Sequence, residues 1–212
     1  MVCLLSIVSF TIMKNKYEKP IAVFHRYGGI TRTSEAIKAG IHPRTLYEML
    51  AKGIIVKLSR GLYRLADLPA LGNPDLISVS KRIPDGVICL ISALTFHKIT
   101  AQIPHMIHVA VSRNMQVPTI DYPPVKTFRF SGNAYSEGIE KQTIDNMKVC
   151  IYSPAKTIAD CFKYRNKIGL DVVIDALKRF KKNKKFNINE VLHFARICRV
   201  EKVIRPYLEA LL

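Results

Sequence analysis

The hydrophobic pattern of the N-terminal third predicts three short helices that are separated by glycines. The first follows Pro20, where Ile21, Phe24 and Tyr27 fall on one helical face before a Gly-Gly pair at 28–29. Two more helices are expected directly after it, each with its own start and stop signals.

The second predicted helix lies within residues 31–40. Thr31 or Thr33 can cap its N-terminus, and Gly40 can end it in a left-handed conformation. The third spans 43–52, with His42 as the cap and Pro43 in the first helical position. Its inward stripe consists of Leu46, Met49 and Leu50. Two such helices joined by a glycine-containing turn form a helix-turn-helix unit, whose second helix enters the major groove of DNA.

Residues 54–65 alternate around a central Arg-Gly pair, which predicts a β-hairpin. We expect Lys57 opposite Arg64 on a basic face, and Leu58 opposite Tyr63 on an apolar face. A hairpin directly after a helix-turn-helix pattern indicates the wing of a winged helix, which lies on the phosphate backbone or enters a minor groove. The alternative is an ordinary hairpin whose charges protect its edge.

The candidate DNA-binding residues lie on the exposed side of the third helix and along this hairpin. Arg44 can reach guanine acceptors or a phosphate, and Thr45 can touch a base edge or a phosphate. Each alone could be a solvated surface residue, and only the group as a whole indicates DNA binding. Its members are Thr33, Arg44, Thr45, Tyr47, Glu48, Lys52, Lys57, Ser59, Arg60 and Arg64.

The C-terminal two-thirds shows a mixed α/β pattern behind a proline- and glycine-containing linker at 69–74. We therefore expect an extension at 1–19, a winged-helix domain at 20–68 and a second domain at 75–212. Helical patterns occur at 75–82, after Ser153-Pro154, along a stripe of Leu170, Val173, Ile174, Leu177 and Phe180, after Asn187 with Glu190, and around Pro206. Strand patterns occur at 105–112, 125–131, 137–144 and 147–153, the last two joined by a turn at Asp145-Asn146. The fold class is α+β.

The charge of the chain points to a polyanionic partner. Lys and Arg number 33 against 16 Asp and Glu, a net charge of +17, which favours nucleic acid. The cations are spread along the chain rather than confined to one amphipathic helix, which argues against a membrane surface. The densest run is either a solvated helix end or a further nucleic-acid or partner contact. It contains Lys178, Arg179, Lys181, Lys182, Lys184 and Lys185.

The cysteines and the N-terminus indicate a cytoplasmic protein. The five cysteines are scattered, and none forms a C-x-x-C pair, so neither a zinc site nor a disulfide framework is expected. The first twelve residues are apolar but lack the basic start of a signal peptide and are too short to span a bilayer. Our hypothesis is that Met13 is the biological start.

Several stretches of the sequence resemble one known family. The segment GGITRTSEAIKAGIHPRTLYEMLAKGIIVKLSRGLYRL resembles the winged helix that opens AbiEi-type antitoxins. The stretches VICLISALTFHKITAQIPHMIHVAV, SPAKTIADCFKYRNKIGLDVVIDALKRF and RPYLEALL are similar to the effector region of that family in order and spacing. The resemblance covers about residues 20–212, and one departure is Lys98, where glycine is expected after the histidine.

The resemblance implies a type IV antitoxin of an abortive-infection system. Such proteins bind inverted repeats upstream of their own operon through the winged helix and repress it. Half-site symmetry would then place two copies on the repeat. Their C-terminal domain counters a nucleotidyltransferase-type toxin, usually without a tight complex. A solitary transcriptional regulator of the same kind is the alternative. No cofactor is implied.

A metal-dependent nuclease is the enzymatic alternative, because it would join a basic α/β domain to a DNA-binding module. Such an enzyme needs clustered carboxylates to hold its metal ions. His105 and His108 are three residues apart, so on a strand they would point to opposite faces and form a poor metal site. Lys156 and Asp160 are four residues apart, which indicates a helix-surface ion pair. No common catalytic motif is present, so we expect no enzyme. The candidate acids are Asp121, Glu137, Glu140, Asp145 and Asp160.

Overall fold

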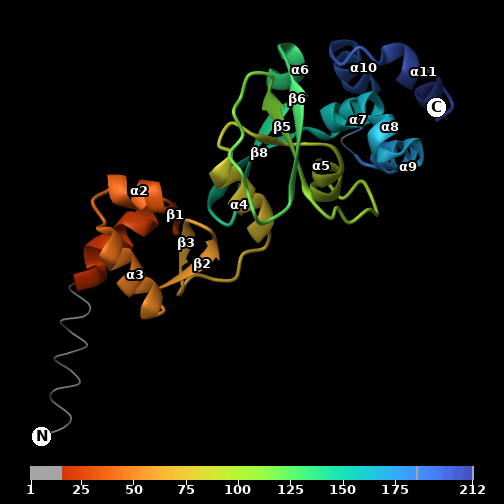
Figure 1. Cartoon of the computed structure of the whole chain (residues 1–212). Helices are drawn as coiled ribbons and strands as arrows, with labels where there is room; N and C mark the ends of the chain where they lie inside the picture. Colours follow the sequence, from red (N-terminus) through yellow and green to blue (C-terminus); the bar gives the residue numbers. More distant parts are fainter. Residues whose placement is uncertain (1–15, 185, 212) are drawn as a thin grey trace, which may run out of the picture. The chain divides into compact units, whose positions relative to one another are not determined.

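The computed structural model describes residues 16–184 and 186–211, drawn in colour in Figure 1. The expected extension up to residue 15, the proposed start at Met13 and the side chain of Lys185 lie outside these residues. The chain divides into two compact units. The first contains the residues up to Pro74 together with Asp145–Met147, and the second contains Asp75–Ile144 and the residues from Lys148 onward.

The first unit places three helices beside a small antiparallel sheet. A helix over 16–26 is followed by β1 (Ile30–Arg32), α2 (Thr33–Lys38), α3 (Pro43–Ala51), β2 (Ile55–Ser59) and β3 (Leu62–Leu65). The strand order is β1-β3-β2. The third strand, β1, precedes α2 and α3 in the chain and pairs with β3 of the β2–β3 hairpin. Figure 1 shows α2 and α3 together beside this sheet.

The helix boundaries in this unit follow the predicted signals in part. The first helix includes Pro20 and the four residues before it, so it begins earlier than the sequence indicated. Neither threonine caps α2: Thr31 is buried in β1, and the N-cap is Arg32, whose N–H donates to Glu35 Oε2 at 2.9 Å. His42 caps α3 as predicted, with its Nδ1 accepting from the N–H of Arg44 at 3.2 Å.

The predicted hairpin forms, but its predicted register is wrong. Lys57 lies opposite Tyr63, and Val56 lies opposite Arg64. The register shifts between Lys57 and Ser59, so Leu58 is an extra residue in β2 and moves every earlier pair by one position. The expected basic face of paired Lys57 and Arg64 is therefore not formed.

Apolar side chains from all parts of the first unit meet in one core. Tyr17 and Phe24 of the first helix, Leu46 and Met49 of α3, and Ile55 of β2 are at most 3% exposed. The inward stripe of α3 is thus buried as predicted, and Leu50 packs at the margin of the core. Burial of this stripe fixes which side of α3 faces solvent.

The second unit is built on a five-stranded mixed sheet with the strand order β6-β5-β4-β8-β7. Its strands are β4 (Val87–Ile88), β5 (Ile107–Ser112), β6 (Val125–Phe130), β7 (Ile139–Ile144) and β8 (Met147–Tyr152). Its helices are α4 (Pro74–Arg82), α5 (Leu90–Phe96), α6 (Asn133–Ser136), α7 (Pro154–Lys163), α8 (Arg165–Ile168), α9 (Leu170–Lys181), α10 (Ile188–Ile197) and α11 (Glu201–Glu209). The predicted α+β class is confirmed at this coarse level.

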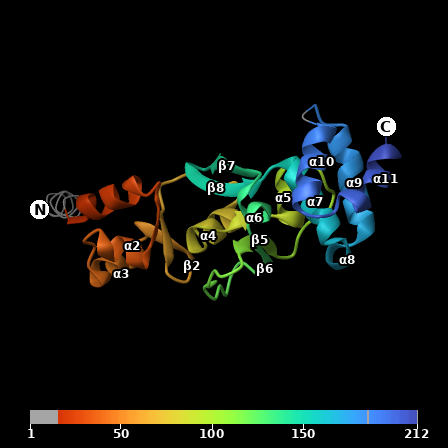
Figure 2. The same cartoon turned by 90° about the horizontal axis from the view of Figure 1, so that it is seen from above.

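Helices pack against both faces of this sheet, and only α5 contributes to the clusters on both. Alternate strand residues point to opposite faces, so Val87 contributes to one hydrophobic cluster and Ile88 to the other. The larger cluster joins the sheet to α5, α7, α9, α10 and α11, and the smaller joins it to α4 and to Ala93 of α5. Figure 2 shows α7, α9, α10 and α11 gathered together. No helix among the described residues is long and apolar enough to cross a membrane.

Most start signals of the second unit act as predicted. Ser153 caps α7 by accepting from Lys156 N–H, and Asn187 caps α10 by accepting from two backbone N–H groups. The helix α11 continues through Pro206 rather than starting or breaking there. The stripe of α9 is buried at Val173, Leu177 and Phe180, half-buried at Ile174 and exposed at Leu170.

Lys98 ends α5 in a backbone conformation that favours glycine. Its φ is +58°, and its N–H and that of Ile99 donate to the carbonyls of Thr95 and Leu94. A non-glycine residue in this left-handed conformation strains the folded state by about 1–2 kcal/mol. Glycine avoids this strain, but its greater freedom in the unfolded chain offsets part of the gain in stability. Lys98, where the family resemblance led us to expect glycine, therefore has a strained backbone conformation.

We predict that Lys98→Gly raises the free energy of unfolding by about 0.5–1 kcal/mol, measured by urea denaturation. Lys98→Ala is the matched control, because it removes the same exposed side chain but keeps the Cβ that causes the strain. An equal gain from both substitutions would contradict a backbone origin.

Candidate nucleic-acid interface

The solvent face of α3 carries large side chains that are free of the core. Arg44 is 84% exposed at the start of the helix, and Tyr47 is 65% exposed one turn later. Lys52 is exposed just after the helix, and Thr45 is half-buried. This face presents guanidinium, phenol and ammonium groups, which suit phosphate and base-edge contacts.

Glu48, on the same helix, is bonded to other residues of its own unit. Its Oε2 accepts from Lys16 Nζ at 2.5 Å and from Tyr17 OH at 3.2 Å, and its Oε1 lies 3.4 Å from Arg44 Nε. The hydrogen bond from Lys16 is the main cause that lowers the pKa of Glu48, and the same bond raises the pKa of Lys16. Glu48 thus binds groups of its own unit, which the sequence did not indicate.

Two ammonium groups approach the ring of Tyr17. Lys16 Nζ lies 5.5 Å and Lys52 Nζ 5.2 Å from the ring centroid. A ring within about 6 Å of a cation attracts it through its quadrupole. Tyr17 is itself buried, so this ring ties the first helix to the end of α3 and holds two cations at the surface.

The hairpin places some of its candidate residues outward and uses others internally. Lys57 in β2 and Arg60 in the turn are exposed, and Ser59 is half-buried. Thr33 donates from its N–H to Gly61 O at 2.9 Å, and its Oγ1 lies 3.4 Å from the same oxygen, so it holds the turn. Arg64 donates to the carbonyl of Leu68 and to that of Pro69 at 2.6 Å, which fixes the segment after β3 instead of extending toward a ligand.

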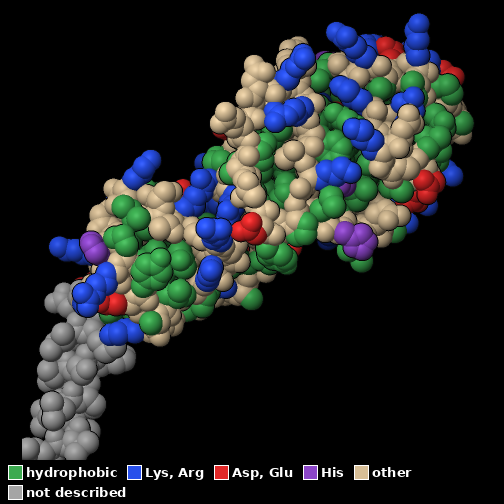
Figure 3. Space-filling view, viewed as in Figure 1, with side chains coloured by type: hydrophobic (Ala, Val, Ile, Leu, Met, Phe, Trp, Pro, Cys, Tyr) green, Lys and Arg blue, Asp and Glu red, His purple; other side chains and the backbone are tan. Residues whose placement is uncertain are grey.

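The basic run at the end of α9 is solvated where the structure describes it. Lys178, Lys181, Lys182 and Lys184 are exposed, and Arg179 pairs with Asp175 at 2.7 Å. On the face drawn in Figure 3, Lys and Arg side chains are distributed over both units. The run adds cations to the second unit, and its role stays a prediction.

Lys156 and Asp160 are buried in the second unit, so the predicted surface ion pair is wrong. Both side chains have zero exposure, and Lys156 Nζ lies 2.6 Å from each carboxylate oxygen of Asp160. Lys156 Nζ also lies 4.2 Å from the ring centroid of Tyr152. The i,i+4 spacing does bring the two side chains together, as predicted. Their burial under α10 and α11 follows from tertiary packing, which the spacing does not show.

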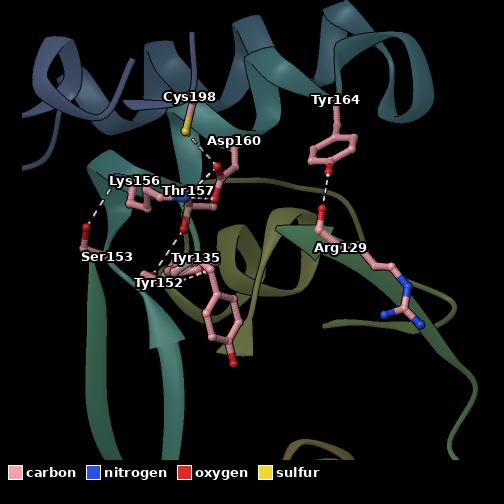
Figure 4. Close-up of polar contacts among 9 residues, drawn as sticks. All are labelled: Arg129, Tyr135, Tyr152, Ser153, Lys156, Thr157, Asp160, Tyr164 and Cys198. Carbon is pink, nitrogen blue, oxygen red and sulfur yellow. Dashed lines mark hydrogen bonds and ion pairs between the residues drawn. The ribbon is translucent and has the colours of Figure 1, made fainter. Parts of the chain in front are cut away.

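The buried pair has a third partner from a distant part of the chain (Figure 4). Cys198 Sγ donates to Asp160 Oδ1 at 3.1 Å. Burial raises the pKa of Asp160, and the Lys156 ammonium opposes that rise. Burial likewise raises the pKa of Cys198 to about 12, so this thiol stays protonated and can donate. The sequence contained no signal for this contact across 38 positions.

Gly138 gives the buried lysine its space. Its φ is +75°, and a Cβ at this position would lie 2.7 Å from Lys156 Cβ. Only glycine fits both the backbone conformation and the close approach. The cluster therefore joins α7, the end of α10 and the loop before β7.

The carboxylates expected of a nuclease do not form a metal site in the described part of the chain. Glu137 lies 3.2 Å from His193, Glu140 accepts from Gln142, and Asp145 accepts from Gly72 N–H. Among the described residues, no group of three or more His, Cys, Asp or Glu side chains is placed so that it could hold a metal ion. The nuclease alternative thus has no ligand cluster there to support it.

The two histidines of the predicted poor metal site have different surroundings. His105 is exposed, whereas His108 is buried against the edge of Phe128. Burial and the nearby Lys126 lower the pKa of His108 to about 4, so its ring is neutral near pH 7. Cys89, Cys161 and Cys198 are buried free thiols, and Cys150 is a half-buried one.

A family model matches part of the first unit. Residues 18–66 match the model described as transcriptional regulator, AbiEi antitoxin. We call these matched residues the AbiEi segment. The resemblance expected from the sequence is confirmed over these residues. All ten candidate DNA-binding residues of the sequence analysis, from Thr33 to Arg64, lie within the AbiEi segment.

A solved structure shares the fold over most of the chain. The crystal structure of the RV2827C protein from Mycobacterium tuberculosis matches with a TM-score of 0.56 and 11% sequence identity, covering 92% of this chain and 80% of that one. At this identity the likeness concerns the fold alone. Comparison with curated protein sequences gave no match.

The buried pair outside the AbiEi segment yields a stability prediction. Asp160→Asn leaves the Lys156 ammonium buried without a counter-ion, so we expect a loss of about 3–5 kcal/mol in the free energy of unfolding. Asp175→Asn is the matched control: it breaks the exposed pair with Arg179 at the same i,i+4 spacing, and should cost under about 0.5 kcal/mol.

The double variant Lys156→Met/Asp160→Leu tests the cause. It removes both charges and keeps an apolar volume, so it should recover most of the stability that Asp160→Asn loses. Urea denaturation gives all four values. A double variant less stable than Asp160→Asn would show that the charges themselves hold this core together.

Proposed function

We propose that this protein is a sequence-specific DNA-binding antitoxin that represses its own operon through an N-terminal winged helix. The observation that carries the proposal is the exposed face of α3, where Arg44 and Tyr47 face solvent and Lys52 follows the helix, within the AbiEi segment. The element order of helix, β1, α2, α3 and hairpin supports the winged-helix proposal. In that design α3 enters the major groove and the hairpin is the wing.

In this proposal the candidate side chains divide into those that contact DNA and those that stabilise the fold of the unit. In this proposal Arg44, Thr45 and Tyr47 approach base edges, because they lie on or beside the exposed face of α3. Lys52, Lys57 and Arg60 contact phosphates, and Ser59 lies next to the wing tip. Glu48, Thr33 and Arg64 act within the unit, since each one bonds to other parts of it. Two copies would bind the two halves of an inverted repeat.

The antitoxin activity proposed for the C-terminal domain at 75–212 rests on the family resemblance. In this proposal it counters a nucleotidyltransferase-type toxin without a stable complex. The exposed lysines at the end of α9 are a candidate contact for nucleic acid or for such a partner. A solitary regulator with the same DNA-binding unit is the alternative, favoured if the adjacent reading frame encodes no toxin.

The DNA-binding proposal predicts a defined response to two substitutions. Wild type should prefer a duplex with the DNA upstream of its own gene over a scrambled duplex of the same composition. Arg44→Ala should lower affinity for the upstream site by about 1–3 kcal/mol if it reads a base. Arg60→Ala should weaken both duplexes and reduce the slope of log K against log salt by about one unit.

Arg26→Ala is the matched control, because Arg26 is exposed in the same unit at the far end of the first helix from Lys16. It should leave the preference for upstream DNA intact. Binding measured by fluorescence anisotropy across a salt series decides the matter. Equal affinity for both duplexes, unaffected by Arg44→Ala and Arg60→Ala, would contradict sequence reading by this unit.

A further inference from the structure

Glu48 lies between Lys16 of the first helix and Arg44 of the proposed DNA face. It is 31% exposed, whereas Lys16 is 54% and Arg44 84% exposed. The carboxylate therefore sits beneath two cations that are open to solvent. Lys16 comes from the first helix and Arg44 from α3, so one anion holds together charges from two elements.

The contacts of Glu48 reduce the charge that the face can offer to phosphate. In the free protein its two oxygens are engaged by Lys16, Tyr17 and Arg44. A phosphate that approaches Lys16 or Arg44 must compete with this carboxylate or be repelled by it. Arg44 Nε lies 3.4 Å from Glu48 Oε1, so this i,i+4 pair favours positions of the Arg44 guanidinium near the carboxylate.

We propose that Glu48 is a specificity-determining residue of the DNA site: its carboxylate holds Lys16 and Arg44 in place and opposes binding that depends on phosphates alone. This inference rests on the proposed function, that α3 reads DNA. It assigns Glu48 a positioning role rather than a direct base contact.

The two kinds of complex respond differently to this charge. Non-specific binding is almost entirely electrostatic, so a carboxylate among the cations weakens it directly. Specific binding also needs base contacts in a fixed register. A side chain that is already held in place loses less conformational freedom when it binds. The positioning of Arg44 therefore offsets the repulsion only at the correct sequence.

Glu48→Gln tests this role, with Glu18→Gln as the matched control. Glu18 is exposed on the same helix as Lys16, and the two variants change the net charge equally. Binding is measured to the upstream duplex and to a scrambled duplex across a salt series. Glu48→Gln should bind scrambled DNA about fivefold tighter at about 0.15 M salt, with a slope steeper by about one unit. Its affinity for upstream DNA should change less, so the preference falls.

The possible results separate the inference from the proposed function. If wild type shows no preference for upstream DNA, the proposed function fails first. If wild type has the preference and Glu48→Gln behaves like Glu18→Gln on both duplexes, the function stands and the role of Glu48 is wrong. A larger gain on scrambled DNA for Glu48→Gln supports it.

A second pair of variants keeps the test valid if Glu48→Gln perturbs folding, which circular dichroism would show. Lys16→Gln uncovers the Glu48 carboxylate, whereas Lys19→Gln removes an exposed lysine three residues further along the helix. Lys16→Gln should weaken binding to scrambled DNA more than Lys19→Gln does. Equal losses would overturn the inference.

Discussion

The burial of one side of α3 is the constraint on which the proposed interface depends. A nine-residue helix is too short to be stable in water alone, so α3 forms because Leu46 and Met49 enter the core with Phe24 and Ile55. That packing fixes the rotation of the helix about its axis. Arg44 and Tyr47 must then face solvent, and His42 and the glycine after the helix fix where it begins and ends.

The second unit depends on a different kind of interaction. Its larger core surrounds a buried lysine–aspartate pair that is completed by a thiol from the end of α10. Such a pair contributes little net stability, because the cost of removing two charges from water offsets their attraction. It does penalise any packing in which one partner lacks the other. We infer that Lys156 and Asp160 define how α7 sits against α10 and the sheet.

Local signals predicted most elements of the fold. His42-Pro43, Ser153-Pro154 and Asn187 act at the helix starts where the sequence placed them. Asp145 and Asn146 turn the β7–β8 hairpin with positive φ values. These succeed because capping and turn chemistry involve residues within a few positions of each other.

The errors arise at an irregularity that the local pattern does not mark, or where the partners lie outside that pattern. The extra residue Leu58 in β2 shifted the hairpin register, and no pattern within the hairpin marked it. The spacing of Lys156 and Asp160 could not show that α10 and α11 cover them. For the candidate site, the exposed positions of α3 were predictable from helical periodicity. The internal engagement of Glu48 and Arg64 was not, because their partners lie outside the helix-turn-helix and hairpin patterns.

Insertion of α3 into the major groove is the step on which sequence reading depends. Dimethyl sulfate methylates guanine N7 in the major groove and adenine N3 in the minor groove, so methylation interference on the upstream duplex tests it directly. If α3 lies in the major groove, N7 methylation of guanines in each half of the repeat should prevent binding, and the interference at one guanine per half should disappear in Arg44→Ala. Binding that is indifferent to guanine N7 methylation and blocked only by adenine N3 methylation would contradict it.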